Sequence, residues 1–250
     1  MHYKQTYRLF NLESAEKEAR SRPTGSSRRV ARSDRLSCLT TKQSILRLKG
    51  ENGLMSKVFF ITGDFCSGTT LLFTLFRKTG EYYSLYEPLH SLLRENLIWP
   101  LRAYEHHFFV DDYFAEYEGF NKIKTPFNPD WAHHRLFMTA ESEGDDLYRY
   151  MSYLIGTGFG RRSKVLLKFN RMTFRLVWLR AKFPNAKIVH IFRDKQAEWN
   201  SIVKRVQQHF GRQDVGQADV KFNGFSLGFW RKDLKTHFPE AGRPKLQQRL

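Results

Sequence analysis

Residues 57–72 constrain the fold more than any other part of the chain. They read KVFFITGDFCSGTTLL: an apolar run, a loop of small residues and, at once, a helix-forming run. A strand, a glycine-containing loop and a helix N-terminus in this order form an anion site. The N–H groups of the loop converge there, and the positive end of the helix dipole faces the same point. The segment therefore predicts a βα unit that binds a phosphate or a similar anion.

The two glycines of this loop have the spacing of a nucleotide-binding P-loop. Gly63 and Gly68 are separated by four residues, as in G-x-x-x-x-G-K-[ST], but Thr69 stands at the position of the lysine. Because that lysine offsets the charge of the β- and γ-phosphates, its absence argues against triphosphate chemistry. The hydroxyls of Ser67, Thr69 and Thr70 suit a smaller anion. An ordinary βα turn with a Thr N-cap stays open as the purely structural interpretation.

Strands and helices alternate further along the chain. Residues 163–168 and 187–192 are short apolar runs that predict buried strands. Apolar residues at helical spacing follow each run, in residues 172–183 and 199–210. This alternation is typical of parallel strands joined by helical crossovers. The sequence therefore predicts an α/β fold of one domain, with three layers built around a parallel sheet.

Three polar features follow strands of this predicted sheet. They are the loop of residues 62–70, Lys168 at the end of one strand and Arg193 directly after another. In parallel sheets, ligands collect at the carboxyl ends of the strands. One cleft is therefore expected to hold all three features.

At this point the chain resembles the sulfotransferases that use 3′-phosphoadenylyl sulfate (PAPS). Residues 61–72 resemble their 5′-phosphosulfate loop, and residues 183–194, with Ser201, resemble their 3′-phosphate element. Lys168 resembles the strand-end lysine that these enzymes place near the reacting sulfate. The resemblance covers about residues 57–210 and is closest to the bacterial and tyrosylprotein-sulfotransferase-like branch. It implies a P-loop-like phosphosulfate-binding loop, with PAPS as the co-substrate and no metal.

The resemblance also implies roles for single residues. Lys168 would stabilise charge on the bridging oxygen, and Glu87 would take the proton from an acceptor hydroxyl, with His90 as the alternative base. A carbohydrate is preferred as the acceptor over a lipid, a peptide tyrosine or a small alcohol. The donor-binding residues that it implies are Gly63, Cys66, Ser67, Gly68, Thr69, Thr70, Arg193 and Ser201.

Two departures from the family pattern predict a reduced activity. Family members usually carry Arg or Lys immediately before the Ser-Gly-Thr-Thr turn, where this chain has Cys66. The region after the predicted 3′-phosphate helix is also short, so the domain of residues 55–250 is expected to be truncated at its C-terminus. A loss of one charge-assisted hydrogen bond weakens binding by about 1.5–3 kcal/mol.

Two other functions stay open. The first is a P-loop nucleotide kinase or NTPase, against which the missing lysine argues. The second is a non-catalytic protein that binds polyanions through its basic N-terminal extension. Separately, Arg193, Ser201, Lys168 and Glu87 could also be surface charges and solvated side chains without a ligand.

Composition sets the remaining expectations. The formal net charge is +17, and residues 1–54 carry 12 Lys and Arg but only 5 Asp and Glu. This stretch predicts a basic extension that is disordered or loosely attached. Nucleic acid is not expected as a partner. Two cysteines give no disulfide framework, and no apolar run is long enough to span a membrane, so a cytoplasmic protein is expected. The resemblance implies that the ring-rich residues 96–137 cover the acceptor site, but ordinary core packing is the expected role of most of these rings.

Overall fold

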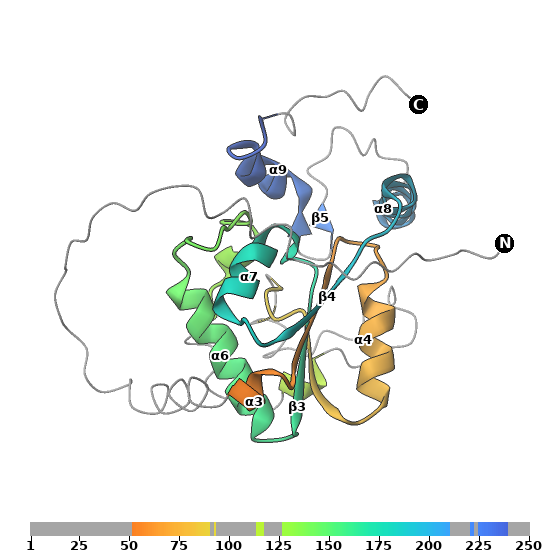
Figure 1. Cartoon of the computed structure of the whole chain (residues 1–250). Coiled ribbons are helices and arrows are strands. Elements are labelled where there is room, and N and C mark those ends of the chain that lie inside the picture. Colours follow the sequence, from red (N-terminus) through yellow and green to blue (C-terminus); the bar gives the residue numbers. More distant parts are fainter. Residues whose placement is uncertain are drawn as a thin grey trace, which may run out of the picture.

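The computed structural model describes the α/β domain in several segments (Figure 1). The described residues are 52–90, 93, 114–117, 127–210, 221–222 and 225–239. Three predicted regions lie wholly or mostly outside them: the N-terminal extension up to residue 51, most of the ring-rich segment 96–137, and the end of the chain after residue 239.

Four parallel strands form the central sheet, in the order β2-β3-β1-β4. Their bounds are β1 Val58–Gly63, β2 Tyr82–Tyr86, β3 Lys164–Phe169 and β4 Lys187–Ile191. All three strand pairings are parallel, and in the register Phe60 of β1 lies between Leu167 of β3 and Ile188 of β4. The predicted parallel α/β sheet is therefore confirmed.

The two central strands are buried almost along their whole length. Each of β1 and β3 has five buried residues out of six, whereas the edge strand β4 is buried only at its last two residues. Parallel strands covered on both faces need continuous apolar runs, and the sequences VFFITG and KVLLKF supply them. The centre of the sheet is thus fixed by the same pattern that predicted the strands.

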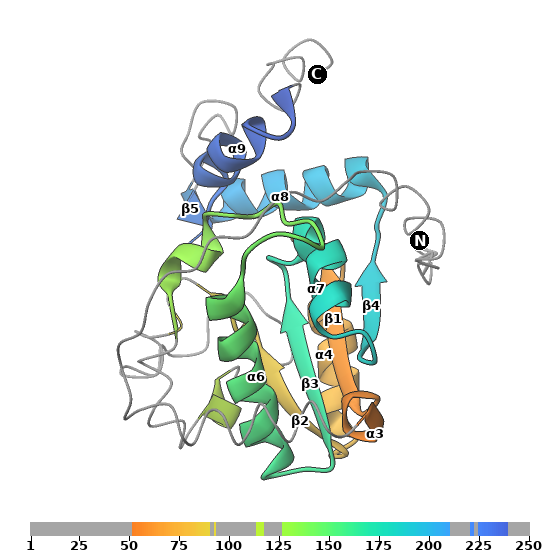
Figure 2. The same ribbon diagram turned by 60° about the vertical axis from the view of Figure 1, so that its left-hand side comes forward.

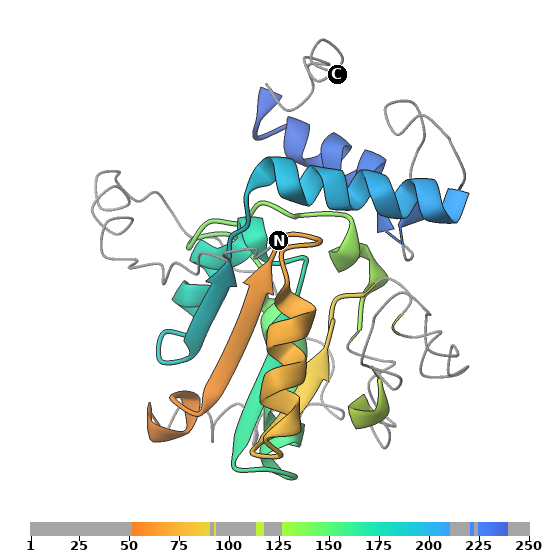
Figure 3. The same ribbon diagram turned by 90° about the vertical axis from the view of Figure 1, so that its right-hand side faces the viewer.

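Helices cover both faces of the sheet (Figures 2 and 3). Helix α4 (Thr69–Lys78) covers one face, and helices α6 (Asp145–Phe159) and α7 (Leu176–Lys182) cover the other. The layer under α4 contains Ile61 and Phe73, and the larger cluster on the opposite face contains Leu154 and Trp178. The two clusters lie on opposite faces of the sheet, between it and the helices, so the domain has three layers.

The predicted helix of residues 172–183 begins differently in the structure. A 3₁₀ turn, η3 (Thr173–Arg175), precedes α7, which ends at Lys182. The N–H of Arg175 donates to the carbonyl of Met172, three residues back, and the Arg175 side chain points inward, where it is completely buried. The helix therefore starts later than its apolar spacing predicts, because its expected first turn is the 3₁₀ turn that directs the Arg175 side chain into the interior.

The remaining elements surround this core. Helix α3 (Asn52–Met55) precedes β1, and the 3₁₀ turns η1 (Ala115–Tyr117) and η2 (Pro129–Ala132) lie in the long connection to α6. Helix α8 (Lys195–Phe210) crosses the carboxyl ends of the strands in Figure 2. The short antiparallel pair β5 (Lys221–Phe222) and β6 (Phe225–Ser226) leads to helix α9 (Leu227–Lys235).

Helix α9 is joined to the rest of the domain by a small apolar cluster. Leu136, Trp230 and Leu234 form its buried part. The ring of Trp230 lies 5.5 Å from the ring of Phe65, between centroids, and its Nε1 donates to the carbonyl of Ala132. This end of the chain therefore contacts the loop after β1. None of the described helices has the length and apolar character needed to cross a membrane.

Candidate functional site

The predicted site residues all lie at or just past the carboxyl ends of the strands, or on the helices that follow. Gly63 ends β1, Lys168 is the last residue but one of β3, and Ser201 lies on α8. Cys66, Ser67 and Gly68 lie in the loop between β1 and α4, Thr69 and Thr70 begin α4, Glu87 follows β2, and Arg193 follows β4. Four different strand ends thus contribute to one edge of the sheet; the sequence placed the loop, Lys168 and Arg193 at such ends but did not predict β2, the strand before Glu87.

The backbone of the loop between β1 and α4 turns sharply. Two residues have left-handed conformations: Cys66, with a φ of 66°, and Gly68, with a φ of 100°. A Cβ atom at Gly63 would lie 2.7 Å from Ser67 Oγ and 2.8 Å from the carbonyl oxygen of Ile191. Glycine is therefore required at Gly63 because the loop and β4 approach the backbone closely.

Hydroxyl groups of the loop are engaged within the protein. Ser67 is buried, and both its N–H and its Oγ donate to the carbonyl of Asp64, at 3.3 Å and 2.7 Å. Thr69 Oγ1 donates to Asn170 Oδ1 at 2.9 Å, and Thr70 Oγ1 lies 3.4 Å from the hydroxyl of Tyr86. These hydroxyls fix the shape of the loop and join it to the ends of β2 and β3.

Arg193 contacts the same loop from the β4 side of β1, opposite the side on which β3 lies. Its Nη1 donates to the carbonyl oxygen of Cys66 at 2.9 Å and to Ser201 Oγ at 3.1 Å. Ser201 Oγ in turn donates to the carbonyl of Ala197 in the first part of α8. The structure thus brings Arg193 and Ser201, eight residues apart in the sequence, to a loop that lies more than one hundred residues before them.

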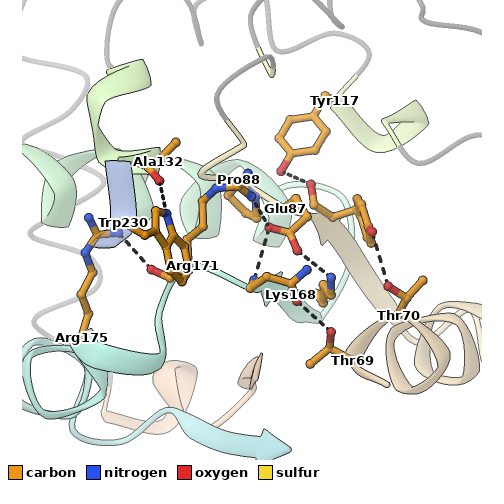
Figure 4. Close-up of polar contacts among 12 residues, drawn as sticks. Thr69, Thr70, Glu87, Pro88, Tyr117, Ala132, Lys168, Arg171, Arg175 and Trp230 are labelled. Atoms are coloured by element: carbon orange, nitrogen blue, oxygen red, sulfur yellow. Dashed lines mark hydrogen bonds and ion pairs between the residues drawn. The ribbon is translucent and has the colours of Figure 1, made fainter. Parts of the chain in front are cut away.

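A buried ion pair lies beside the loop at the ends of β2 and β3 (Figure 4). Lys168 Nζ donates to Glu87 Oε1 at 2.6 Å, and the two side chains are 0% and 2% exposed. The ammonium also lies 4.5 Å from the centroid of the Tyr86 ring. Burial raises the pKa of the Glu87 carboxyl, but Lys168 and Arg171 outweigh this effect and hold the pKa below its ordinary value. Glu87 is therefore ionised at neutral pH.

The turn that carries Glu87 is held by the backbone. Glu87 has a φ of 45°, and its N–H donates to the carbonyl of Lys168 at 2.9 Å. The hydroxyl of Tyr117 donates to the carbonyl of Tyr86, and that of Tyr150 donates to the carbonyl of Pro88. His90, the alternative base, is also buried, and its N–H donates to the carbonyl of Glu87.

Sequence reasoning missed two residues of this cluster. The side chain of Arg171 lies 3.2 Å from Glu87 Oε2, and the N–H of Asn170 donates to the same oxygen at 3.3 Å. Asn170 also accepts the hydrogen bond of Thr69. The only signal in the sequence was their position directly after the strand that carries Lys168.

A second missed group is acidic. Asp64, in the loop itself, accepts hydrogen bonds from Thr173 Oγ1 at 2.9 Å and from Lys195 Nζ at 2.5 Å. Lys195 also bonds Glu198, whose carboxyl is buried, and this burial raises the pKa of Glu198. Asp64 therefore ties the loop to η3 and to the start of α8, and Lys195 balances its charge. The described residues contain no group of three or more His, Cys, Asp or Glu that could hold a metal ion.

A comparison with models of protein families gives a match. A family model described as the sulfotransferase family matches residues 59–243, which is more than half of the chain. The matched range includes every site residue described above. No curated protein and no solved structure matches the chain.

Proposed function

The chain belongs to the sulfotransferase family, and on that basis we propose that it transfers the sulfuryl group of PAPS to a hydroxyl group of an acceptor. Family membership supports sulfuryl transfer in general. The donor, the acceptor class and the roles of single residues are part of the proposal.

The contact of Arg193 with the loop supports PAPS as the donor. PAPS carries a phosphosulfate at the 5′ position of its ribose and a phosphate at the 3′ position. Loop N–H groups at a helix N-terminus suit the first, and a guanidinium suits the second. Because Arg193 Nη1 lies 2.9 Å from the carbonyl of Cys66, the two groups are close enough to serve one nucleotide.

Lys168 and Glu87 are the proposed catalytic residues. The acceptor oxygen forms a bond to sulfur while the bond from sulfur to the 5′-phosphate oxygen breaks, and Glu87 takes the acceptor proton. Lys168 stabilises the charge that develops on the leaving oxygen, and 3′,5′-adenosine bisphosphate is released. The 2.6 Å contact between the two side chains supports this division, because it places an amine and a carboxylate side by side next to the loop.

Glu87 has the charge state that a base requires. The two cations beside it keep the carboxyl ionised at neutral pH, although they also make it a weaker base than an unpaired carboxylate. If Lys168 turns toward the leaving oxygen during transfer, Glu87 loses one cation and becomes more basic. The proposed step therefore strengthens the base at the moment at which the proton is released.

We also propose a carbohydrate as the acceptor. The support is compositional: residues 96–137 include eleven Trp, Tyr and Phe side chains of the kind that stack on sugar rings. Most of this segment lies outside the described residues.

Binding measurements on the full chain test the donor. Calorimetry should compare 3′,5′-adenosine bisphosphate with adenosine 5′-phosphosulfate, which lacks the 3′-phosphate, and with ATP. We expect the bisphosphate to bind at least about tenfold more tightly than either, a difference of about 1.4 kcal/mol. Equal or tighter binding of ATP would favour a nucleotide kinase or NTPase. Binding of heparin without any binding of the bisphosphate would favour a polyanion-binding protein.

A further inference from the structure

We propose that Arg171 is a positioning residue for the transfer reaction. Its guanidinium holds the Glu87 carboxylate through Oε2 and fixes this carboxylate relative to the loop between β1 and α4. The inference rests on the proposed function, because it takes Glu87 as the base. Neither the sequence motifs nor the family match gives Arg171 a role.

The two oxygens of Glu87 are held by different groups. Lys168 Nζ contacts Oε1 at 2.6 Å, whereas Arg171 Nη1 and the N–H of Asn170 contact Oε2 at 3.2 Å and 3.3 Å. Figure 4 shows Glu87 between the two cations. If Lys168 engages the leaving oxygen, the contacts at Oε2 remain. The carboxylate then keeps its orientation during the step in which it accepts the proton.

Arg171 is itself held in place. Its side chain is 1% exposed, and its guanidinium carbon lies 5.5 Å from the centroid of the Phe65 ring, within cation–π range. The carbonyl of Arg171 accepts a 3.0 Å hydrogen bond from Nη1 of Arg175, another buried side chain. The side chain and the backbone carbonyl of Arg171 are thus both fixed, so Arg171 loses little conformational entropy when it holds the Glu87 carboxylate.

The segment of residues 168–171 contacts the loop between β1 and α4 at two points. Phe65, which packs against Arg171, belongs to this loop, and Thr69 donates to the side chain of Asn170. Residues 168–171 therefore contact the loop on one side and Glu87 on the other. A shift of the loop on binding a donor would be passed to the carboxylate through Arg171 and Asn170.

Among the described residues, four titratable or charged groups face Glu87. Lys168 and Arg171 come from β3 and the turn after it, His90 comes from the turn after β2, and Tyr117 comes from η1. Lys168, Arg171 and His90 all lower the pKa of Glu87, whereas burial raises it. Removal of the Arg171 charge should therefore raise this pKa while Lys168 stays in place.

The test measures Glu87 directly, without an acceptor. Carboxyl carbon NMR on Glu-labelled protein, with Glu87 assigned from Glu87→Gln, gives its pKa in wild type and two variants. Arg171→Met, similar in length but uncharged, should raise the pKa of Glu87 by about one unit or more. Arg171→Lys, which keeps the charge, should recover at least half of this shift. Binding of 3′,5′-adenosine bisphosphate should change less than about threefold in either variant, about 0.7 kcal/mol.

A folded Arg171→Met protein with an unchanged Glu87 pKa would overturn the proposal, and so would equal shifts in the Met and Lys variants. If Arg171→Met does not fold, Arg171→Gln replaces it, because glutamine also lacks the charge but can still donate a hydrogen bond. Failure of the wild-type protein to bind the bisphosphate would remove the proposed function instead. The pKa shift would then still stand as a property of the cluster.

Discussion

Nη1 of Arg193 donates a hydrogen bond to the carbonyl oxygen of Cys66 at 2.9 Å. The side chain proposed to bind the 3′-phosphate therefore also holds the loop proposed to bind the 5′-phosphosulfate. Since Arg193 follows the edge strand β4 and Cys66 follows the central strand β1, this bond joins two neighbouring strand ends. The two parts of the proposed donor site cannot move apart without breaking this hydrogen bond.

Replacement of Arg193 should distinguish binding of the donor's 3′-phosphate from binding of its 5′-phosphosulfate. Arg193→Ala is expected to weaken binding of 3′,5′-adenosine bisphosphate more than about tenfold, or about 1.4 kcal/mol, in calorimetry. It should weaken binding of adenosine 5′-phosphosulfate much less, because this ligand has no 3′-phosphate. Lys204→Ala, which removes an exposed charge from the same helix α8, is the matched control. Equal losses for both ligands would mean that Arg193 only supports the loop.

A positive charge introduced into the loop should strengthen donor binding. Cys66 is partly exposed, and its carbonyl faces Arg193. A charge-assisted hydrogen bond is worth about 1.5–3 kcal/mol, so Cys66→Arg should raise the affinity for PAPS by at least about tenfold. Cys66→Ser, which stays neutral, should leave the affinity nearly unchanged. The gain should shrink at high ionic strength. Unchanged or weaker binding by Cys66→Arg would contradict the prediction.

The buried pair of Lys168 and Glu87 should be strongly coupled in stability. Loss of one partner of a buried ion pair costs about 3–5 kcal/mol, because the other charge is left in the interior. Lys168→Met and Glu87→Gln should each lower the free energy of unfolding in urea, and the double variant should lose clearly less than the two single losses together. Additive losses would show that the pair is not coupled.

The exposed pair of Lys164 and Glu81 provides the control for this cycle. It has the same chemistry, with an Nζ–Oε2 distance of 2.5 Å, but its side chains are 40% and 56% exposed. Because solvent screens such a pair, the corresponding cycle should give a coupling too small to measure.

Buried His190 should make the protein less stable as the pH falls. Its Nδ1 lies 2.6 Å from Thr62 Oγ1, and burial lowers its pKa, so the folded state keeps it neutral. In the unfolded chain, His190 takes up a proton near the ordinary pKa of histidine, about 6.5. The free energy of unfolding should therefore decrease as the pH falls from about 7.5 to 5.5.

A variant without the imidazole tests whether His190 causes this slope. One such group contributes at most about 1.4 kcal/mol per pH unit. His190→Asn cannot take up the proton and should flatten the slope measured by urea unfolding at several pH values. Some slope should remain, because burial also lowers the pKa of His133. An identical slope in wild type and His190→Asn would exclude His190 as its source.

The sequence predicted the frame of the site well. Strong local patterns carried these predictions: apolar runs for β1 and β3, small residues for the loop, and a strand-end position for Lys168 and Arg193. Strand ends in a parallel sheet meet at one edge, so their gathering followed from the fold class. That the structure places Arg193 against the loop is a consequence of the pairing of β1 with β4.

The partners of these residues could not be predicted, because they depend on contacts between distant segments. Asp64 looks unfavourable in an anion-binding loop until Lys195 and Thr173 are seen beside it. Arg171 follows no periodicity, and its burial and its contacts with Glu87 and Phe65 become visible only in the folded chain. The helical spacing of residues 172–183 likewise gave no sign that Arg175 would point inward.

Arg175 has a structural role that a strand usually fills. Its guanidinium donates to the carbonyls of Trp131, His134, Arg135 and Arg171, and residues 133–138 contain no helix or strand. A segment paired in a sheet loses one hydrogen bond among many when a residue changes, whereas loss of Arg175 would remove the bonds to Trp131, His134, Arg135 and Arg171 at once. The irregular segment that follows η2 and packs against α9 thus depends on one side chain, Arg175. Natural variation at this position should be far less tolerated than its place on a predicted amphipathic helix suggests.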